Sequence, residues 1–372
     1  MNYYIIAGEA SGDLHGSNLM YALKERDPSA SFRCWGGDLM QQAGGELVKH
    51  YRDLAFMGFW EVVVNLKTIL TNLRFCERDI LASKPDVLIL IDYPGFNLRM
   101  AKFAKRNGIR VFYYISPQLW AWKSSRVKVI QQCVERMFVI LPFEKDFYRK
   151  YNYTVDFVGH PLLDAISPGK EISDRYHFLK QNDLPEKPII ALLPGSRKQE
   201  IRTMLRFMIE VVPSFSSYQF VVAGAPSIDP GFYSSIIGQA SIPVIYKQTC
   251  DLLSHGEAAL VTSGTATLEA ALVGTPEVVC YRGNPLSFWI ARRIVHVPFI
   301  SLVNLIMNRE VVKELIQHMV TPENLVQELK RLLDPDIREK MKNGFQELTL
   351  NLGGSGASDR TASLMIQYLE GN

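Results

Sequence analysis

Val87-Leu88-Ile89-Leu90-Ile91 is a run of five apolar residues that ends directly at Asp92. A strand without polar positions is buried on both faces, which is typical of a parallel sheet covered by helices. Similar runs alternate with helical patterns, so the sequence predicts an α/β fold. In the first half the predicted strands are Tyr3–Ala7, Val87–Ile91, Val111–Ile115, Met137–Ile140 and Val155–Val158, and the predicted helices are Ser17–Arg26, Asn65–Ser83, Leu98–Asn107 and Lys123–Val134.

A second α/β series follows a segment that breaks the pattern. Residues 161–188 contain four prolines and mixed charge, which indicates a linker. We therefore expect two Rossmann-like domains facing each other across a cleft, residues 1–168 and 186–349, with a helical tail of residues 350–372 packing back toward the first domain. The second series comprises predicted strands at Ile189–Leu193, Gln219–Ala223, Pro243–Tyr246, Ala259–Thr262 and Glu277–Tyr281, and helices at Pro322–Leu333, Pro335–Leu350 and Ser358–Leu369.

Charge is divided unevenly between the two halves. The 372-residue chain has a net charge of +3, but residues 1–160 hold 21 Lys/Arg against 16 Asp/Glu, and the remainder holds 20 against 22. A basic first half suggests that this domain meets something anionic, such as nucleic acid, acidic lipid or a phosphorylated substrate. Scatter in surface charge explains the difference equally well.

Several classes of site are disfavoured by the residue patterns. The five cysteines are dispersed without a C-x-x-C pair, and H-x-x-x-H is absent, so we expect no disulfide framework and no metal. Neither G-x-G-x-x-G nor a Walker motif occurs, so no nicotinamide or ATP cofactor is expected. The apolar stretch Ile294–Met307 is shorter than the roughly 20 residues that span a bilayer. We therefore expect a cytoplasmic protein.

Loops after the strands of the first half carry candidate functional residues, because ligands of such sheets bind at the carboxyl ends of the strands. Residues 8–16 are rich in glycine and open a helix, and they include Glu9, Ser11, Asp13 and His15. Asp92 ends a buried strand, where an unpaired carboxylate is costly. It is either the N-cap of the next helix or a base placed to take a proton from a hydroxyl.

Two further loops allow a functional and a structural interpretation. Trp120 and Trp122, with Arg126 and Lys128 behind them, either bind a sugar or acyl chains or anchor the core. His160 ends a predicted strand just before the linker, and a lone histidine there is more often structural than catalytic.

The second half contains two turns suited to a nucleotide. In the first, Gly195 allows close backbone approach, and Ser196 with Gln199 has capping-box spacing. Arg197 in the first helical turn is unfavourable unless an anion such as a diphosphate binds there. In the second turn, the Glu269 carboxylate suits a ribose diol. The residues of this turn are Ser263, Gly264, Thr265, Ala266, Thr267 and Glu269.

Eight short motifs occur in an order that resembles the lipid-A-disaccharide synthase family. The similarity covers nearly the whole chain and includes Tyr281-Arg282, Asn304 and Arg309-Glu310. The motifs are GEASGD (Gly8–Asp13), MGFWEV (Met57–Val62), DYPGFN (Asp92–Asn97), SPQLWAW (Ser116–Trp122), LPFE (Leu141–Glu144), GHP (Gly159–Pro161), LPGSR (Leu193–Arg197) and SGTATLE (Ser263–Glu269).

The resemblance implies a GT-B glycosyltransferase of the lipopolysaccharide pathway. Such enzymes transfer diacylglucosamine from its UDP conjugate to the 6-hydroxyl of diacylglucosamine 1-phosphate. The configuration inverts, and the products are a β-1,6-linked disaccharide 1-phosphate and UDP, without a required metal or cofactor.

The family's functional positions carry over onto matching residues. Asp92 matches the acidic residue proposed as the base, whereas Gly95 stands where the family often has a second acidic residue. Asp13 is therefore the alternative base. The resemblance implies donor-binding positions at Arg197 and Glu269. Arg282 and Asn304 are two further predicted donor-binding residues.

Two diacylated substrates favour a peripheral contact with the inner membrane of a Gram-negative bacterium. The apolar segment with Met57, Phe59 and Trp60 is followed by Lys67, Arg74 and Arg78, a pattern that suits an anionic lipid surface or, alternatively, a buried core helix. Together with Glu9, Ser11, Trp120 and Trp122 these apolar residues form the predicted acceptor and lipid region. The helical tail either packs back or exchanges with a partner chain in a homodimer.

Two other functions fit the same architecture. A sugar-nucleotide epimerase would need no acceptor, and a non-catalytic protein would bind the nucleotide-sugar or lipid without turnover. Nucleic acid is not expected as a partner, because the aromatic and basic residues form no recognition motif.

Overall fold

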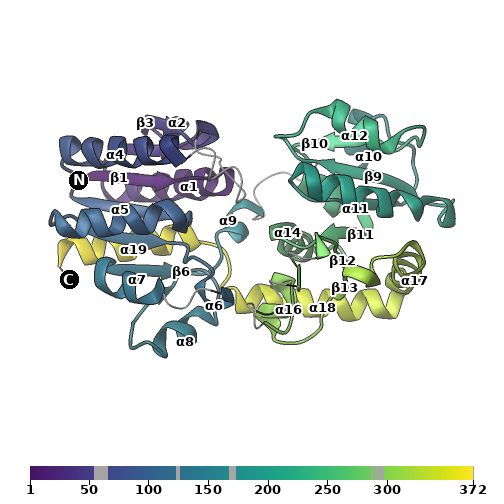
Figure 1. The fold of residues 1–372 in the computed structure, drawn as a ribbon. Coiled ribbons are helices and arrows are strands. Elements are labelled where there is room, and N and C mark those ends of the chain that lie inside the picture. The colour runs from purple at the N-terminus through teal and green to yellow at the C-terminus, as the bar shows by residue number, and fades with distance from the viewer. Residues whose placement is uncertain are drawn as a thin grey trace. The chain divides into compact units, whose positions relative to one another are not determined.

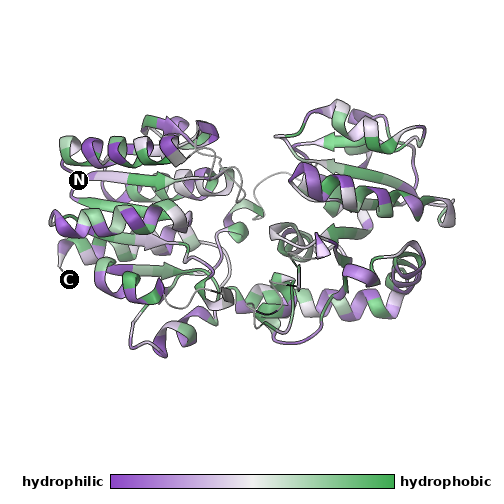
Figure 2. Ribbon diagram, viewed as in Figure 1, coloured by the Kyte–Doolittle hydropathy of each residue, from purple (hydrophilic) through white to green (hydrophobic). Residues whose placement is uncertain are grey.

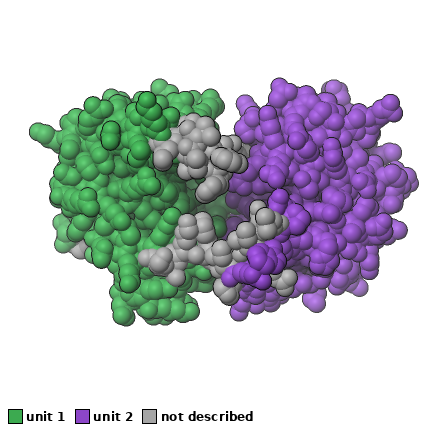
Figure 3. Space-filling model, viewed as in Figure 1, with its two compact units in different colours: residues 1–164, 352–372 green, residues 165–351 purple. Residues whose placement is uncertain are grey.

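The computed structural model describes residues 1–53, 66–122, 126–166, 173–285, 288–289, 293 and 297–371. It divides into two compact units (Figure 3). Each unit has its own sheet. Unit 1 comprises residues 1–164 together with 352–372, and unit 2 comprises residues 165–351.

Unit 1 is built on a seven-stranded sheet in the order β3-β2-β1-β4-β5-β6-β7, with every neighbouring pair parallel. The central strand β4 is buried at all five positions, as its apolar sequence predicts. The strands are β1 (Asn2–Ala7), β2 (Ser31–Gly36), β3 (Glu46–His50), β4 (Val87–Ile91), β5 (Arg110–Tyr114), β6 (Arg136–Val139) and β7 (Asp156–Phe157).

Helices cover both faces of this sheet, and the last one returns from the far end of the chain. Helix α19 packs against α1 (Figure 1). Its N-terminus is held by Asp164, whose carboxylate accepts hydrogen bonds from the backbone N–H groups of Gly356, Ala357 and Ser358. The helices are α1 (Ala10–Arg26), α2 (Asp38–Gln42), α4 (Leu66–Ser83), α5 (Pro94–Arg106), α6 (Leu119–Trp122), α7 (Val127–Cys133), α8 (Glu144–Arg149), α9 (Leu162–Ile166) and α19 (Ala357–Glu370), with a 3-10 turn η1 (Tyr51–Asp53).

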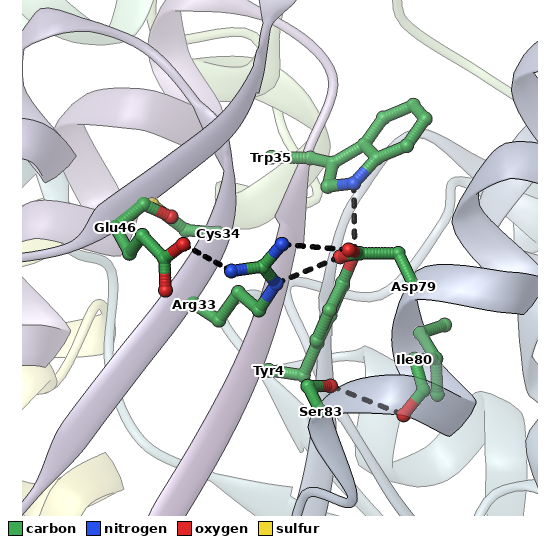
Figure 4. A network of polar contacts seen from close by, with 8 residues as sticks. All are labelled: Tyr4, Arg33, Cys34, Trp35, Glu46, Asp79, Ile80 and Ser83. Carbon is green, nitrogen blue, oxygen red and sulfur yellow. Dashed lines mark hydrogen bonds and ion pairs between the residues drawn. The ribbon is translucent and has the colours of Figure 1, made fainter.

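A network of hydrogen bonds and ion pairs joins α4 to strands β1 and β2 (Figure 4). Arg33 on β2 donates to both oxygens of Asp79 on α4, at 2.9 and 2.7 Å, and also pairs with Glu46. The Tyr4 hydroxyl donates to Asp79 at 2.6 Å and accepts from the Trp35 indole N–H at 2.8 Å. Each buried donor in this chain of contacts therefore has an acceptor, which makes the burial of a charged pair tolerable.

Unit 2 has a six-stranded parallel sheet in the order β10-β9-β8-β11-β12-β13. Its strands are β8 (Ile189–Leu193), β9 (Gln219–Gly224), β10 (Val244–Tyr246), β11 (Gly256–Thr262), β12 (Glu277–Tyr281) and β13 (Lys313–Ile316). Its helices are α10 (Arg175–Gln181), α11 (Lys198–Glu210), α12 (Pro230–Ile237), α13 (Thr249–Ser254), α14 (Thr265–Val273), α16 (Leu302–Met307), α17 (Pro322–Leu332) and α18 (Pro335–Asn351), with 3-10 turns η3 (Val212–Ser214) and η4 (Gln317–Met319).

Hydrophobic residues concentrate along the central strands, while the helices carry hydrophilic residues on their outer faces (Figure 2). This distribution is that of two separately cored α/β units. Among the described residues, none of the helices combines the length and apolar character that crossing a bilayer requires.

Candidate functional site

Each sheet has one point at which the strand order reverses, and ligands of open α/β sheets bind beside such points, at the carboxyl ends of the strands. In unit 1 the reversal lies between β1 and β4, where Ala7 pairs with Ile91. In unit 2 it lies between β8 and β11, where Leu193 pairs with Val261. The residues that follow these four strands are therefore the candidate functional residues.

The backbone after β4 is strained. Asp92 and Tyr93 have φ values of +43° and +46°, a left-handed conformation that non-glycine residues rarely adopt twice in succession. Such a conformation persists only where its surroundings impose it. Here the Asp92 carbonyl accepts a hydrogen bond from the Tyr113 hydroxyl at 2.5 Å and another from the Asn97 amide at 2.8 Å. These two donors hold the backbone that carries the Asp92 carboxylate.

The loop after β1 fits closely against this strained turn. A Cβ atom on Gly8 would lie 2.3 Å from the Tyr93 ring, so only glycine lets the ring lie over the end of β1. Glu9 follows as the N-cap of α1, in an extended conformation and without a side-chain cap. The structure thus brings Glu9 near Asp92, as their common edge of the sheet predicts.

The Asp92 carboxyl, directly after β4, has a raised pKa. Burial and, to a smaller extent, the nearby Glu9 carboxylate raise the pKa of this carboxyl to about 6, against the lowering effect of the Tyr93 backbone N–H. A carboxylate with a pKa near 6 is ionised at neutral pH and yet basic enough to accept a proton from a polarised hydroxyl. This combination is suited to a general base.

Asp13 has a different environment. Its buried carboxylate accepts hydrogen bonds from the backbone N–H groups of Gly37, Leu39 and Met40, at 2.8, 3.1 and 3.0 Å. These contacts join α1 to the start of α2. The carboxylate therefore acts as the anchor of a helix N-terminus.

The two histidines of the predicted loops are both buried and neutral. Burial lowers the pKa of His15 to about 4 and that of His160 to about 3. The His160 Nδ1 atom accepts from the Leu162 backbone N–H at 3.2 Å. A structural role for His160, as its position before the linker suggests, is consistent with these contacts.

The remaining predicted residues of unit 1 are on its surface or outside the described ranges. Ser11 is exposed in the first turn of α1, and Trp120 is half-buried with its ring edge-to-face against Phe143 at 5.0 Å. The predicted lipid contacts Met57, Phe59 and Trp60 lie outside the described residues, as does the side chain of Trp122.

Glu144 ends the LPFE motif but was not predicted as a site residue, although its surroundings are unusual. The pKa of its carboxyl is raised to about 7, because burial outweighs the lowering effect of hydrogen bonds from the Leu141 and Ile140 backbone N–H groups. The Ser116 and Trp120 side chains lower the pKa of this carboxyl as well. Glu144 thus links the loop that carries Trp120 to the end of β6.

The turn after β8 in unit 2 depends on Gly195, whose φ is +112°. Arg197 follows as the N-cap of α11, with an extended backbone (φ −110°, ψ 142°), so the prediction that it lies in the first helical turn is wrong. The predicted capping pair of Ser196 and Gln199 is also wrong. Because the helix begins one residue later than that pair requires, Glu200 occupies the third helical position and its carboxylate accepts from the Arg197 N–H.

The turn after β11 presents small polar residues at the start of α14. Gly264 and Thr265 are exposed, Ser263 and Ala266 are partly exposed, and Thr267 is buried with its hydroxyl donating to the Gly264 carbonyl. The Ser263 hydroxyl donates to the Ile300 carbonyl at 3.1 Å. Open backbone at a helix N-terminus suits a phosphate or a ribose.

Glu269 lies one turn into α14. Burial raises the pKa of its carboxyl, and the Cys250 thiol donates to Oε1 at 3.3 Å. A partly buried carboxylate with a weak thiol donor has acceptor capacity left for the two hydroxyls of a ribose. Cys250 was not predicted, because it is distant in sequence and part of no motif.

Arg282 and Asn304, the other predicted donor residues, differ in their surroundings. Arg282 is exposed, with its guanidinium 4.6 Å from the Phe207 ring centroid and a hydrogen bond to the Val320 carbonyl. The Asn304 amide is buried, donates to Val312 and Glu314, and accepts from the Val311 and Val312 backbone N–H groups. Asn304 therefore shapes the loop before β13, and we do not assign it to the donor.

At the reversal point of unit 1, β4 thus ends at the carboxylate of Asp92, and at that of unit 2, β8 ends in the glycine turn that precedes Arg197. In the described part of the chain, no three His, Cys, Asp or Glu side chains come together as a potential metal site. Proton transfer and the binding of a phosphorylated group are the chemistry that these residues support directly.

Known proteins resemble the chain along its whole length. Residues 3–366 match the family model described as lipid-A-disaccharide synthetase. A lipid-A-disaccharide synthase from Syntrophus aciditrophicus is 40% identical, with 98% of this chain and 97% of the relative covered. One from Myxococcus xanthus is 39% identical, with coverage of 98% and 97%.

Solved structures share the fold at low sequence identity. A UDP-GlcNAc 2-epimerase from Neisseria meningitidis bound to UDP-GlcNAc has a TM-score of 0.64 at 13% identity, with both chains fully covered. The glycotransferase of kitacinnamycin has a TM-score of 0.65 at 15% identity, with 99% of each chain covered. The fold is GT-B, as predicted. The family match over residues 3–366 and the near-full-length relatives show that the chain belongs to the lipid-A-disaccharide synthase family.

Proposed function

We propose that the chain is an inverting glycosyltransferase that joins two acylated glucosamines. It transfers 2,3-diacylglucosamine from its UDP conjugate to the 6-hydroxyl of 2,3-diacylglucosamine 1-phosphate. The products are the β-1,6-linked disaccharide 1-phosphate and UDP. Family membership supports the substrate classes, and the position and basicity of Asp92 are the observation that carries the mechanism.

Asp92 is the proposed base. Its carboxylate takes the proton of the acceptor 6-hydroxyl as the hydroxyl oxygen forms a bond to the anomeric carbon, and the bond from that carbon to the diphosphate breaks. A single displacement of this kind inverts the anomeric configuration. We prefer Asp92 to Asp13 because three backbone N–H groups already occupy the Asp13 carboxylate as hydrogen-bond donors and fix it to the start of α2.

The turns after β8 and β11 are the proposed donor site. The backbone around Gly195 and Ser196 and the Arg197 guanidinium bind the diphosphate and stabilise the charge that UDP acquires as it leaves. The turn of Ser263–Thr267 lies beside it because β8 and β11 are neighbours, and Glu269 accepts hydrogen bonds from the ribose hydroxyls. Arg282 is the proposed additional cation.

An epimerase is the second candidate, because solved epimerases share the fold. The two activities are separated by incubating the protein with the UDP-diacylglucosamine donor, with and without the monophosphate acceptor, followed by chromatography that resolves isomers and by mass spectrometry. We expect disaccharide 1-phosphate and UDP in equal amounts, and only when the acceptor is present. Conversion of the donor to an isomer of equal mass without the acceptor would identify an epimerase, and no turnover would identify a binding protein.

A peripheral contact with an anionic membrane is proposed for the outer face of α4. This face exposes three cations, Lys67, Arg74 and Arg78, among three large apolar side chains that are also exposed, Leu70, Phe75 and Leu81. Cations attract anionic headgroups, and the apolar side chains between them enter the headgroup layer. Diacylated substrates reside in such a layer, so this face places unit 1 where its substrates are.

Replacing these three cations with Gln should weaken binding to anionic vesicles about 100-fold, because each contributes about 1 kcal/mol near such a surface. Co-sedimentation with phosphatidylglycerol vesicles measures the change. The matched control is the triple variant K330Q/R331Q/K340Q, which removes the same charge from exposed positions of unit 2. An equal loss in both variants would mean that net charge alone, and not this face, attracts the membrane.

A further inference from the structure

The anion-binding turn of unit 2 already holds an anion that belongs to the chain. The Glu200 Oε2 atom accepts hydrogen bonds from the backbone N–H groups of Ser196 and Arg197, at 3.3 and 3.4 Å. Its other oxygen, Oε1, accepts from the Arg197 guanidinium at 2.9 Å. One carboxylate therefore engages two N–H groups and the cation with which this turn would bind a phosphate.

Gly195 makes this position of the carboxylate sterically accessible. A Cβ atom on Gly195 would lie 2.8 Å from Glu200 Oε2 and 2.9 Å from Glu200 Cβ, which is closer than real Cβ atoms approach. The φ of +112° at Gly195 also disfavours any other residue. The turn is thus shaped so that an oxygen anion can lie directly over its backbone, and the Glu200 side chain keeps 29% of its surface exposed.

We propose that Glu200 is an internal competitor for the diphosphate subsite, an assignment that rests on the proposed function. Its carboxylate satisfies the N–H groups and the guanidinium while the subsite is empty, and the diphosphate displaces it. The partly exposed side chain can rotate toward solvent, since three hydrogen bonds within its own turn are what hold the carboxylate among the residues that the structure describes.

A competitor with a negative charge discriminates between donor and product. UDP ends in a phosphate monoester whose second pKa is about 6, so at neutral pH it carries about one more negative charge than a UDP-sugar. A carboxylate beside the diphosphate repels UDP more strongly than it repels the donor. Glu200 should therefore favour release of the product and limit inhibition by UDP.

The test is the E200Q variant, whose amide keeps the length of the side chain and an oxygen that accepts N–H groups but lacks the charge. Calorimetry with UDP and with inorganic pyrophosphate measures affinity in the wild-type protein and in the variant. We expect E200Q to bind UDP about tenfold more tightly, since one neighbouring charge is removed at close range. Inhibition of turnover by UDP should strengthen by a similar factor, and affinity for the donor should rise less.

The control is E210Q, which removes the same charge at the exposed C-terminal end of α11. Its UDP affinity should equal that of the wild-type protein. Thermal unfolding of both variants checks that each is folded, and a gain in affinity can come only from folded protein.

Equal or weaker binding of UDP by E200Q would overturn the inference, and would mean that Glu200 only orients Arg197. A failure of the proposed function looks different. In that case wild-type protein would not bind UDP specifically, while pyrophosphate would still bind E200Q more tightly if the carboxylate competes for the turn. Absence of binding of either anion to both proteins would overturn both proposals.

Discussion

Asp92→Asn should lower the rate of disaccharide formation by about 10²–10⁴-fold, the usual contribution of a positioned general base. The amide has nearly the same shape but cannot accept the hydroxyl proton. Because the role proposed for Asp92 is toward the acceptor and not the nucleotide, affinity for UDP should stay unchanged. Single-turnover transfer with saturating donor and calorimetry with UDP measure the two quantities.

The same substitution should stabilise the folded protein at neutral pH. The pKa of Asp92 is about 6 in the folded state against 3.8 for an unperturbed aspartate, so the unfolded chain releases this proton more readily. Folding stability therefore falls as the pH rises from about 4 to about 6, and the penalty is fully present above pH 6. Asn avoids it, which should add about 1–2 kcal/mol after allowance for partial solvent exposure.

Asp146→Asn is the matched control for both effects, because it removes the same charge from an exposed position on α8. Its transfer rate and stability should remain close to those of the wild-type protein. A D92N variant that retains more than a tenth of the wild-type rate would exclude Asp92 as the base, whatever its stability.

Arg197→Gln should lower kcat/KM for the donor by about 10²–10³-fold, the loss expected when one charged donor to a developing oxyanion is removed. Affinity for UDP should fall as well, because the guanidinium also binds the ground-state diphosphate. Initial rates at varied donor concentration give the loss. Arg202→Gln, further along α11 where the guanidinium stacks on Phe232, is the control and should lose little.

The double variant R197Q/E200Q separates the two roles of Arg197. If the Arg197 guanidinium also offsets the negative charge of Glu200 beside the diphosphate, removing both side chains will cost less than the product of the two single changes. Effects that multiply simply would show that Arg197 acts on the donor independently of Glu200. A single variant R197Q with unchanged kcat/KM would contradict the proposed donor site.

The sequence predicts the central strands well because they are buried on both faces. The run Val87–Ile91 and the strand Ile189–Leu193 occur in the structure with the predicted bounds. Adjacent loops could then be assigned to one edge of each sheet by the rule for parallel strands. In contrast, β2, β3 and β13 were not predicted, because polar residues such as Arg33 and Lys49 interrupt their apolar pattern.

The geometry of the candidate site depends on contacts that no local pattern contains. Tyr113 reaches the Asp92 carbonyl from the neighbouring strand, and the left-handed backbone at Asp92 and Tyr93 has no sequence signature of its own. The spacing of Ser196 and Gln199 predicted a capping box, but the helix begins one residue later and Glu200 makes the contact. Such one-residue shifts are within the ordinary uncertainty of helix boundaries.

The central claim is that Asp92 accepts the acceptor proton, and the pH dependence of kcat/KM for the acceptor tests it most directly. Because burial raises the pKa of Asp92 to about 6, activity should be level above pH 7 and fall tenfold for each pH unit below 6, as the carboxylate becomes protonated. The residual activity of D92N should lack this decline. A wild-type profile that stays level to about pH 4.5, or a decline that persists in D92N, would contradict the assignment of Asp92 as the base.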